Sequence, residues 1–497
     1  MKYNNKSAAL RRQVSTSTII ALAVAAMTCV GGVDPMPAAA QSVPAASDGS
    51  ATCAAVGTRS GTSSSTNVTY AAYAGGGSSD ALNVAQVADN CLVYAGGRIS
   101  TAVPVAARKI GAATTDKSTG VLTLAWPQNG QIVAAVRFGN AINDAQLRRG
   151  TGDVVVASDA GLAVLSSDLA TTRWRQDGNF TRAAVGTDGT VAGLYGSGGK
   201  QLAVYSAGGT AIFSRTFTDS MVNDVAVFTG ATAADTRVIV TGMAQRDGGG
   251  CTKLQVAWIR AYNLKNELVW KSYDWTHAQA FARSSSCADT RGYRVEVGLD
   301  AKLYFAGEAA GGNSIYRFGS ADLQAAAPNA TSDAYNNPYN TRSNHITYFT
   351  RLDPLTGAQS AGSFLLARLT NGSGNTIRPR AITADQSGAV YVGGISAAHI
   401  QNRPNIVLNG KKLQVYTGGD PWLLILSPDF RQRRLWIALA DGGQGEVQAI
   451  GVGGGAVAVA TRADKKDVND FALYTTPGAA TTYSGTKAGH LTVIPSN

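Results

Sequence analysis

Seven polar residues recur at one position of a repeated short strand, and they are the first candidates for chemistry. Each stands directly before the small apolar residue of that strand. They are Asn83, Asp144, Arg182, Asp224, Arg294, Arg380 and Gln448. Carboxylates, guanidinium groups and amides gathered at one place can orient a charged or hydroxyl-rich ligand. The same groups can instead neutralise one another between strands, as Asp144 and Arg182 would.

Four aromatic residues form the second group of candidates. Trp275, Tyr335, Tyr339 and Tyr416 lie in long segments rich in Asn, Ser and Gly. An aromatic face with amide neighbours suits a sugar ring or a peptide segment, because it buries apolar area while polar partners stay near. The alternative is that these rings pack the long segments onto a scaffold.

Signatures of metal or hydrolytic chemistry are missing from the sequence. His277, His345 and His399 fall in three of the same long segments, but no two have the spacing of metal ligands. The chain has no GxSxG and no HExxH motif. We therefore predict no metal and no cofactor, and assign no catalytic residue.

The N-terminus has the pattern of an export signal. Basic residues precede the apolar run Ile19–Val30, and Ala38-Ala39-Ala40 offers a small-residue cleavage site. The run is too short for a membrane anchor. Removing residues 1–40 leaves 39 Lys and Arg against 31 Asp and Glu, a formal charge of +8. We predict a bacterial protein that is secreted or periplasmic, and a charge too dispersed for nucleic acid.

Four cysteines remain after that cleavage, and an even number in an exported chain predicts two disulfides. They are Cys53, Cys91, Cys251 and Cys287. Three pairings are possible, and proximity in the chain favours Cys53–Cys91 and Cys251–Cys287. We interpret both as stabilising exported loops.

The elements that position these residues are short strands. Runs rich in Val, Tyr, Ile and Thr alternate with Gly, Asp, Asn and Ser, and no long helical pattern occurs. Segments such as Arg380–Gly394, RAITADQSGAVYVGG, combine a short strand, a tight turn and an apolar strand, and seven copies can be aligned. A third and a fourth strand follow in most copies. The sequence predicts an all-β, seven-bladed β-propeller of four-stranded antiparallel blades.

Two segments resemble a known family. Asn67–Gly97, NVTYAAYAGGGSSDALNVAQVADNCLVYAGG, is similar to the SBBP-type bacterial propeller repeat, in which a Tyr-containing strand ends in Gly-Gly and a strand, an Asp turn and V-Y-x-G-G follow. Val390–Ser427, with VYVGG and GGDPWLLILS, repeats the pattern. The family has no known function. The resemblance implies the fold and export, and transfers no catalytic residue.

This alignment predicts the organisation of the chain. Residues 1–40 are the signal peptide and 41–66 a flexible lead-in rich in Ser, Ala and Gly. The propeller spans 67–476, with 67–74 as the outer strand that closes the last blade. Residues 477–497 are either an added strand or a surface tail.

Function is expected on the face that carries the long segments. We predict that 99–117, 243–253, 272–291, 308–344 and 396–420 lie on one rim, concentrated in blades 4–6, because binding commonly resides in loops on a rigid scaffold. Our first hypothesis is a monomeric, non-enzymatic scaffold that binds a polysaccharide or an extracellular protein there. One alternative is a polysaccharide lyase or glycoside hydrolase that uses Arg380, Arg294 and an acid such as Asp224 or Glu308. The other is a structural envelope or matrix protein.

Overall fold

The computed structural model describes residues 53, 54, 56–77, 79–283, 287–337, 344–414, 416, 418–464 and 473–496. All of them belong to the compact unit Ser42–Asn497. The expected signal peptide and residues 41–52 of the lead-in lie outside the described residues.

The protein is all-β. The described residues form seven sheets of four or five strands, which we number in chain order. Sheet 1 contains β3 (Ala81–Val87), β4 (Val93–Arg98), β6 (Gly120–Ala125), β7 (Ile132–Arg137) and β5 (Arg108–Lys109). Sheet 2 contains β8 (Ile142–Leu147), β9 (Val154–Ser158), β10 (Gly161–Leu165) and β11 (Thr172–Asp177). Sheet 3 contains β12 (Phe180–Val185), β13 (Val191–Tyr195), β14 (Gln201–Tyr205) and β15 (Ala211–Thr216).

The remaining sheets follow the same order. Sheet 4 contains β16 (Met221–Phe228), β17 (Arg237–Arg246), β18 (Leu254–Tyr262) and β19 (Leu268–Ser272). Sheet 5 contains β20 (Thr290–Val297), β21 (Leu303–Ala310), β22 (His345–Leu352) and β23 (Gln359–Leu365). Sheet 6 contains β26 (Ile377–Ala384), β27 (Val390–Ser396), β30 (Asp420–Leu426) and β31 (Arg433–Ala438). Sheet 7 contains β32 (Gln444–Gly453), β33 (Ala456–Asp464), β34 (Lys487–Pro495) and β2 (Tyr70–Ala74).

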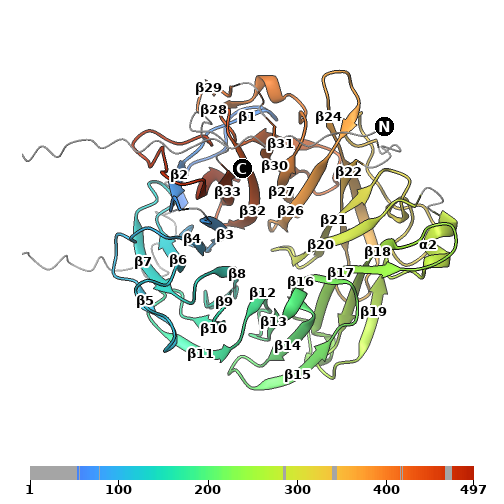
Figure 1. The fold of residues 1–497 in the computed structure, drawn as a ribbon, viewed down its shortest axis with the longest axis horizontal. Helices are drawn as coiled ribbons and strands as arrows, with labels where there is room; N and C mark the ends of the chain where they lie inside the picture. The colour runs from blue at the N-terminus through green and yellow to red at the C-terminus, as the bar shows by residue number, and fades with distance from the viewer. Residues whose placement is uncertain are drawn as a thin grey trace, which may run out of the picture. The chain divides into compact units, whose positions relative to one another are not determined.

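The first strands of the sheets surround a common centre (Figure 1). Each of β3, β8, β12, β16, β20, β26 and β32 contacts the next, and β32 contacts β3 again. Stacking of this kind buries both faces of a sheet between its neighbours, which explains why the second strands are almost continuously apolar and buried.

Two tryptophans of outer strands, Trp174 and Trp270, hydrogen-bond to a turn of the neighbouring sheet. The Trp270 indole of sheet 4 donates a 3.0 Å hydrogen bond to the Pro354 carbonyl in a turn of sheet 5. Gly357 in that turn has φ +73°, and a Cβ there would come within 2.6 Å of the indole. The turn needs glycine both for its backbone conformation and for the space the ring occupies.

A β-bulge interrupts the first strand of every sheet at the same place. The register between strands 1 and 2 skips one residue in each case. These bulge residues are Asn83, Asn143, Thr181, Asn223, Tyr293, Arg380 and Gln448. A bulge bends its strand and changes the direction of the side chains around it, so it decides which residues face the centre.

Sheet 7 is assembled from both ends of the described chain. β34 pairs with β33, and β2 pairs antiparallel with β34, from Tyr70 opposite Val493 to Ala74 opposite Gly489. The segment 477–497 therefore supplies a strand rather than a tail. The propeller was predicted to end at residue 476, yet the third strand of sheet 7 ends at Pro495. Its first residue, Lys487, lies opposite Asp464, and 22 residues of sequence separate the two.

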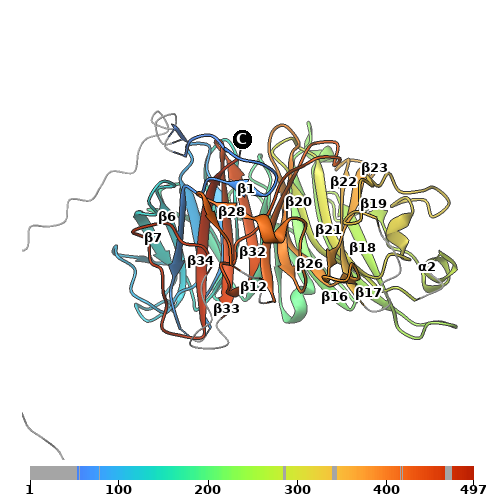
Figure 2. The ribbon, with the colours of Figure 1, turned by 90° about the horizontal axis from the view of Figure 1, so that it is seen from above.

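The described part of the lead-in is attached to the sheets. β1 (Ser65–Thr66) pairs in parallel with β28 (Val407–Leu408), which lies beside it in Figure 2. The Trp436 amide of β31 donates to the Ser63 carbonyl at 2.7 Å. The lead-in thus covers the outer edge of sheet 6.

The long insertions also cover outer strands. The Ala330 amide donates to the Gly362 carbonyl of β23 at 2.6 Å, and the Gly362 amide donates to the Pro328 carbonyl at 3.0 Å. β5 pairs in parallel with β7. Among the described residues, the outer strands of sheets 2, 3 and 4 pair with no further strand. Covering an edge satisfies its backbone groups and prevents edge-to-edge association.

Both predicted disulfides are confirmed. Cys53 and Cys91 have Cα atoms 5.1 Å apart, and Cys251 and Cys287 have Cα atoms 5.7 Å apart. Cys91 lies in the β3–β4 turn. Cys251 and Cys287 join the β17–β18 loop to the segment that contains α2 (His277–Arg283). In the described part of the chain, every helix is too short or too polar to cross a membrane.

Candidate ligand site in the central channel

The seven first strands line a channel with three compartments. The insertion-side cavity, about 230 Å³, lies at the start of these strands and is lined by Asn83, Asn143, Thr181, Arg182, Arg294 and Gln448. A waist of about 50 Å³ follows. The turn-side cavity, about 640 Å³, lies at the turns between strands 1 and 2. Its size is within the range of small-molecule sites.

Bulge asparagines tie each sheet to the next around the insertion-side cavity. The Asn83 side-chain amide donates to the Ile142 carbonyl at 3.0 Å, and Asn143 donates to the Phe180 carbonyl at 2.7 Å. Asn223 donates to the Gly292 carbonyl at 2.6 Å. Each acceptor carbonyl belongs to the residue directly before the bulge of the next sheet.

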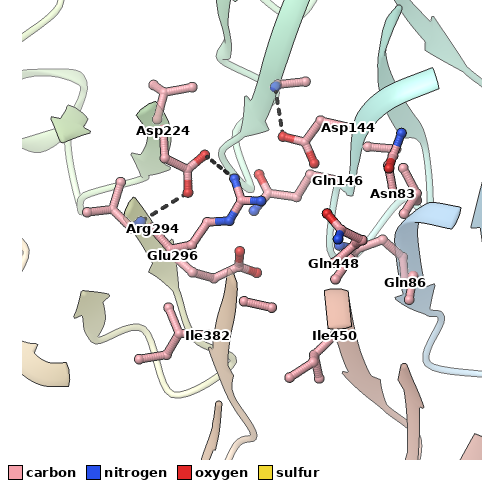
Figure 3. Close-up of a pocket in the computed structure, with 18 residues that line it drawn as sticks. Asn83, Gln86, Asp144, Gln146, Asp224, Arg294, Glu296, Ile382, Gln448 and Ile450 are labelled. Carbon is pink, nitrogen blue, oxygen red and sulfur yellow. Dashed lines mark hydrogen bonds and ion pairs between the residues drawn. The ribbon is translucent and has the colours of Figure 1, made fainter. Parts of the chain in front are cut away.

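The residues after the bulge form an alternating charge series in sheets 2 to 5. They are Asp144, Arg182, Asp224 and Arg294. Arg182 Nε lies 3.7 Å from Asp224 Oδ1. Arg294 Nη1 lies 3.9 Å from the same oxygen (Figure 3). Asp144 accepts from the Ala183 amide at 3.1 Å, and Asp224 accepts from the Val295 amide at 3.0 Å. Each carboxylate thus joins its own sheet to the following one.

Burial dominates the electrostatics of this series. It raises the pKa of Asp224 to about 6, although Arg294 and Arg182 oppose the shift. It also raises the pKa of Asp144. The pKa of Arg294 is lowered to about 10, because its guanidinium is desolvated and lies near Arg182. Two carboxylates and two guanidinium groups balance each other in charge, which lowers the free-energy cost of burying them in the waist and its entrance.

The seven polar residues that the sequence placed at one position of the repeated strand occupy two structurally different positions. Asn83, Arg380 and Gln448 are bulge residues, whereas Asp144, Arg182, Asp224 and Arg294 follow a bulge. Four of these charged side chains lie between neighbouring sheets, as the second interpretation expected. The ion pair of Arg182 is with Asp224, however, and not with Asp144.

Arg380 lies apart from the charge series. Its Nε donates to the Glu446 carboxylate, and its guanidinium lies over the Tyr293 ring, 5.6 Å from the centroid. Only its backbone carbonyl contacts the series, where it accepts from Arg294. Arg294 and Arg380 therefore present their guanidinium groups to different partners.

Glu308, the other acid considered for catalysis, is a buried hub. Its side chain is 1% exposed and is surrounded by Arg291, His345 Nδ1 at 2.9 Å and Arg378 Nε at 3.0 Å. Burial alone would raise its pKa, but the His345 hydrogen bond and the two arginines outweigh it and lower the pKa to about 2. An ionised carboxylate cannot act as a general acid near neutral pH.

The described aromatic candidates contact the scaffold. Tyr335 packs edge-on against Trp436, with ring centroids 5.5 Å apart. Tyr416 lies beside His399 at 4.9 Å, and Trp275 packs against the core of sheets 4 and 5. Tyr339 lies outside the described residues. Contact of these rings with a ligand stays a prediction.

Sequence reasoning missed Glu296. It is the third residue after the bulge in sheet 5, and the equivalent residues are neutral: Gln86, Gln146, Ala184, Ala226, Thr383 and Gly451. Glu296 lines both the waist and the turn-side cavity. A single acid in a column of amides and small residues was the available signal, and it is visible only once the bulge fixes the alignment.

No family model matches the chain, and no curated protein matches it. A solved structure titled "Structure of U3-55K" aligns with a TM-score of 0.35 and 10% identity, over 71% of this chain and 94% of that chain. A likeness this distant carries no argument, so the fold described above rests on the strand pairing of the chain itself.

Proposed function

We propose that the seven sheets are the blades of a closed propeller, completed by β2, and that the protein is an exported, non-catalytic scaffold. In this proposal it binds a polysaccharide or an extracellular protein through the insertion layer. We define the insertion layer as the described residues within 247–253, 273–289, 311–344 and 397–419. The two disulfides fit an oxidising compartment outside the cytoplasm. The SBBP-like motif is consistent with the same assignment.

The observation that carries the proposal is a chain of side-chain bonds between separate insertions. Arg283, at the end of α2, donates to Gln324 of the next insertion. Asp333 of that insertion accepts from Gln401 at 3.3 Å and pairs with Arg433. Cys251–Cys287 fixes the first of these segments. Loops that are ordered before binding lose less conformational entropy when a partner arrives, which favours a recognition role.

The proposal is tested by measuring the binding of the wild-type protein and of two matched variants to arrays of polysaccharides and of envelope proteins. Tyr416→Ala removes a half-buried ring of the insertion layer. Tyr205→Ala removes a half-buried ring from uncovered sheet 3, where it packs 5.5 Å from Trp174. We expect saturable binding that Tyr416→Ala weakens at least fivefold and Tyr205→Ala leaves unchanged.

Two results would overturn the proposal. One is the absence of binding to any partner on either array, which would favour a structural envelope protein. The other is turnover of an anionic polysaccharide that Arg380→Ala abolishes, which would favour the enzyme alternative.

A further inference from the structure

The turn-side cavity has a floor and walls of different chemistry. Apolar side chains from several sheets form much of its wall, among them Leu147, Val185, Val227, Val297 and Ile450. Gln86, Gln146 and Thr187 add neutral polar groups. The charged residues Asp89, Arg149 and Asp385 also line the cavity, and each has a partner: Arg149 pairs with Asp89, and Asp385 accepts from the Tyr391 hydroxyl. The cavity narrows towards the waist, where Glu296 stands at the boundary of the two compartments.

Glu296 differs from every other acid of the channel in lacking a partner. Among the described residues, no hydrogen bond or ion pair reaches its half-buried carboxyl, which points into the open centre in Figure 3. Asp144 and Asp224, by contrast, each accept a backbone amide of the next sheet. A desolvated carboxyl without partners is costly to retain unless something binds it.

The positive charges near Glu296 are already engaged. Arg149, from the β8–β9 turn, pairs with Asp89 at 3.0 Å and donates to the Val87 and Val452 carbonyls at 2.9 and 2.8 Å. Arg294 and Arg182 lie on Asp224. The waist-lining residues of β3, β26 and β32 are uncharged.

The charges that face Glu296 make its surroundings unfavourable for an unpaired anion. Burial raises its pKa, and Asp224 and Asp144 raise it further. Arg149 and Arg294 oppose them, and the result is a pKa of about 8. Near neutral pH the empty site therefore holds a neutral carboxyl that a nearby cation would ionise.

We propose that the turn-side cavity binds a small organic ammonium ion, whose N–H groups donate to the Glu296 carboxylate while its apolar body packs against the Val, Leu and Ile wall. This site lies at the opposite end of the channel from the insertion-side cavity, and it does not depend on the proposed scaffold function. Binding transfers the Glu296 proton to the solvent, so one proton leaves for each ammonium ion that enters at pH values below that carboxyl's titration.

Titration calorimetry of the full mature chain with cyclohexylammonium tests the site, with cyclohexanol as the neutral probe of the same shape. Only protein with an ionised Glu296 binds the cation. We therefore expect the affinity to fall tenfold per pH unit below pH 8, which is about 100-fold between pH 9 and pH 6. At pH 6.5, heats measured in buffers of different ionisation enthalpy should report release of close to one proton.

Two variants complete the experiment. Glu296→Gln keeps the size of the side chain and removes its charge, and should weaken cyclohexylammonium binding at least tenfold at pH 9 and abolish the pH dependence. Glu267→Gln makes the same change at an exposed turn of sheet 4 and should leave binding unchanged. Thermal unfolding at pH 5, where Glu296 is protonated, should be the same for the wild type and Glu296→Gln, which shows that the variant folds.

Three outcomes would overturn the site: no measurable cyclohexylammonium binding at pH 9, equal affinity for cyclohexanol, or unchanged affinity in Glu296→Gln.

Discussion

The two ends of the central channel are built from the same seven strands, yet the polar groups at each end have different roles. At the insertion side, Asn143, Arg182 and Arg294 all bond to the following sheet. At the turn side, the cavity is wider, apolar side chains form part of its wall, and Glu296 has no partner among the described residues. The difference teaches that charge around a propeller axis is not by itself a sign of a binding site. Partnered charges tie neighbouring sheets together, and the unpartnered carboxyl is the group that the proposed ligand would bind.

Replacing Arg294 should give the largest effect, because it attacks the partnered end. Arg294→Met leaves Asp224 buried with a single weak cation partner and removes the bond to the Arg380 carbonyl. We expect a loss of about 3–5 kcal/mol in the free energy of unfolding, measured by urea titration. Arg173→Met, at a 54% exposed side chain paired with Asp153, should cost under about 1 kcal/mol. Equal stabilities for the two variants would break the comparison.

The two disulfides provide a second contrast between the ends. Their sequence separations are nearly equal, 38 and 36 residues. Each double Cys→Ala variant should therefore lose a similar amount, about 2–4 kcal/mol, in guanidinium unfolding. Only loss of Cys251–Cys287 should also weaken partner binding by the insertion layer. If loss of Cys53–Cys91 weakened that binding equally, the layer would not be the interface.

Removing the charge of Glu296 should stabilise the protein at alkaline pH. Its pKa is raised from 4.5 to about 8 in the folded state, so the folded protein holds an extra proton and loses stability as pH rises from about 4.5 through 8. The Glu296→Gln variant does not lose this stability, because a glutamine side chain does not titrate. We expect it to be about 2 kcal/mol more stable than the wild type at pH 9. Converting the full pKa shift at roughly 1.4 kcal/mol per pKa unit would give a larger stabilisation. We expect less because water in the channel screens the charge.

Differential scanning calorimetry at pH 5 and pH 9 measures this shift, with Glu267→Gln as the control. A Glu296→Gln protein that is less stable than the wild type at pH 9 would mean that the carboxylate has favourable contacts in the folded state, which would contradict its lack of a partner among the described residues.

A bulge asparagine should give the smallest effect. Asn143→Ala removes one hydrogen bond to the Phe180 carbonyl and should cost about 1 kcal/mol. Asn140→Ala, three residues earlier and exposed, should be neutral within about 0.5 kcal/mol. Urea unfolding of the pair distinguishes them. Indistinguishable stabilities would indicate that the ties between sheets contribute nothing.

The strand pattern was predictable because it depends on local chemistry. Apolar runs such as Val390–Gly394 between Gly- and Asp-rich turns indicate strands, and Asp385–Gly388 forms the predicted turn, with Asp385 accepting the Ser387 amide at 2.8 Å. The place of Lys487–Pro495 was left open because the partner of a strand cannot be derived from its own composition.

The site was less predictable, since it depends on register. A bulge adds one residue without leaving a fixed sequence signature: the bulge residue is Asn in sheet 2, Thr in sheet 3 and Tyr in sheet 5. One residue of offset moves a side chain to the other face of a strand, so Asp144 was aligned with Asn83 although Asn143 is its equivalent. Glu296 was hidden for the same reason.

The most direct test of the central claim is the titration of the glutamate carboxyl groups by ¹³C NMR. The chain contains four glutamates, Glu267, Glu296, Glu308 and Glu446, so selectively labelled protein gives few signals, and the Glu296→Gln spectrum assigns one of them. We predict that the Glu296 carboxyl titrates near pH 8, and that cyclohexylammonium lowers this midpoint. Completion of all four titrations below pH 6 would contradict an unpartnered, desolvated carboxyl at the floor of the turn-side cavity.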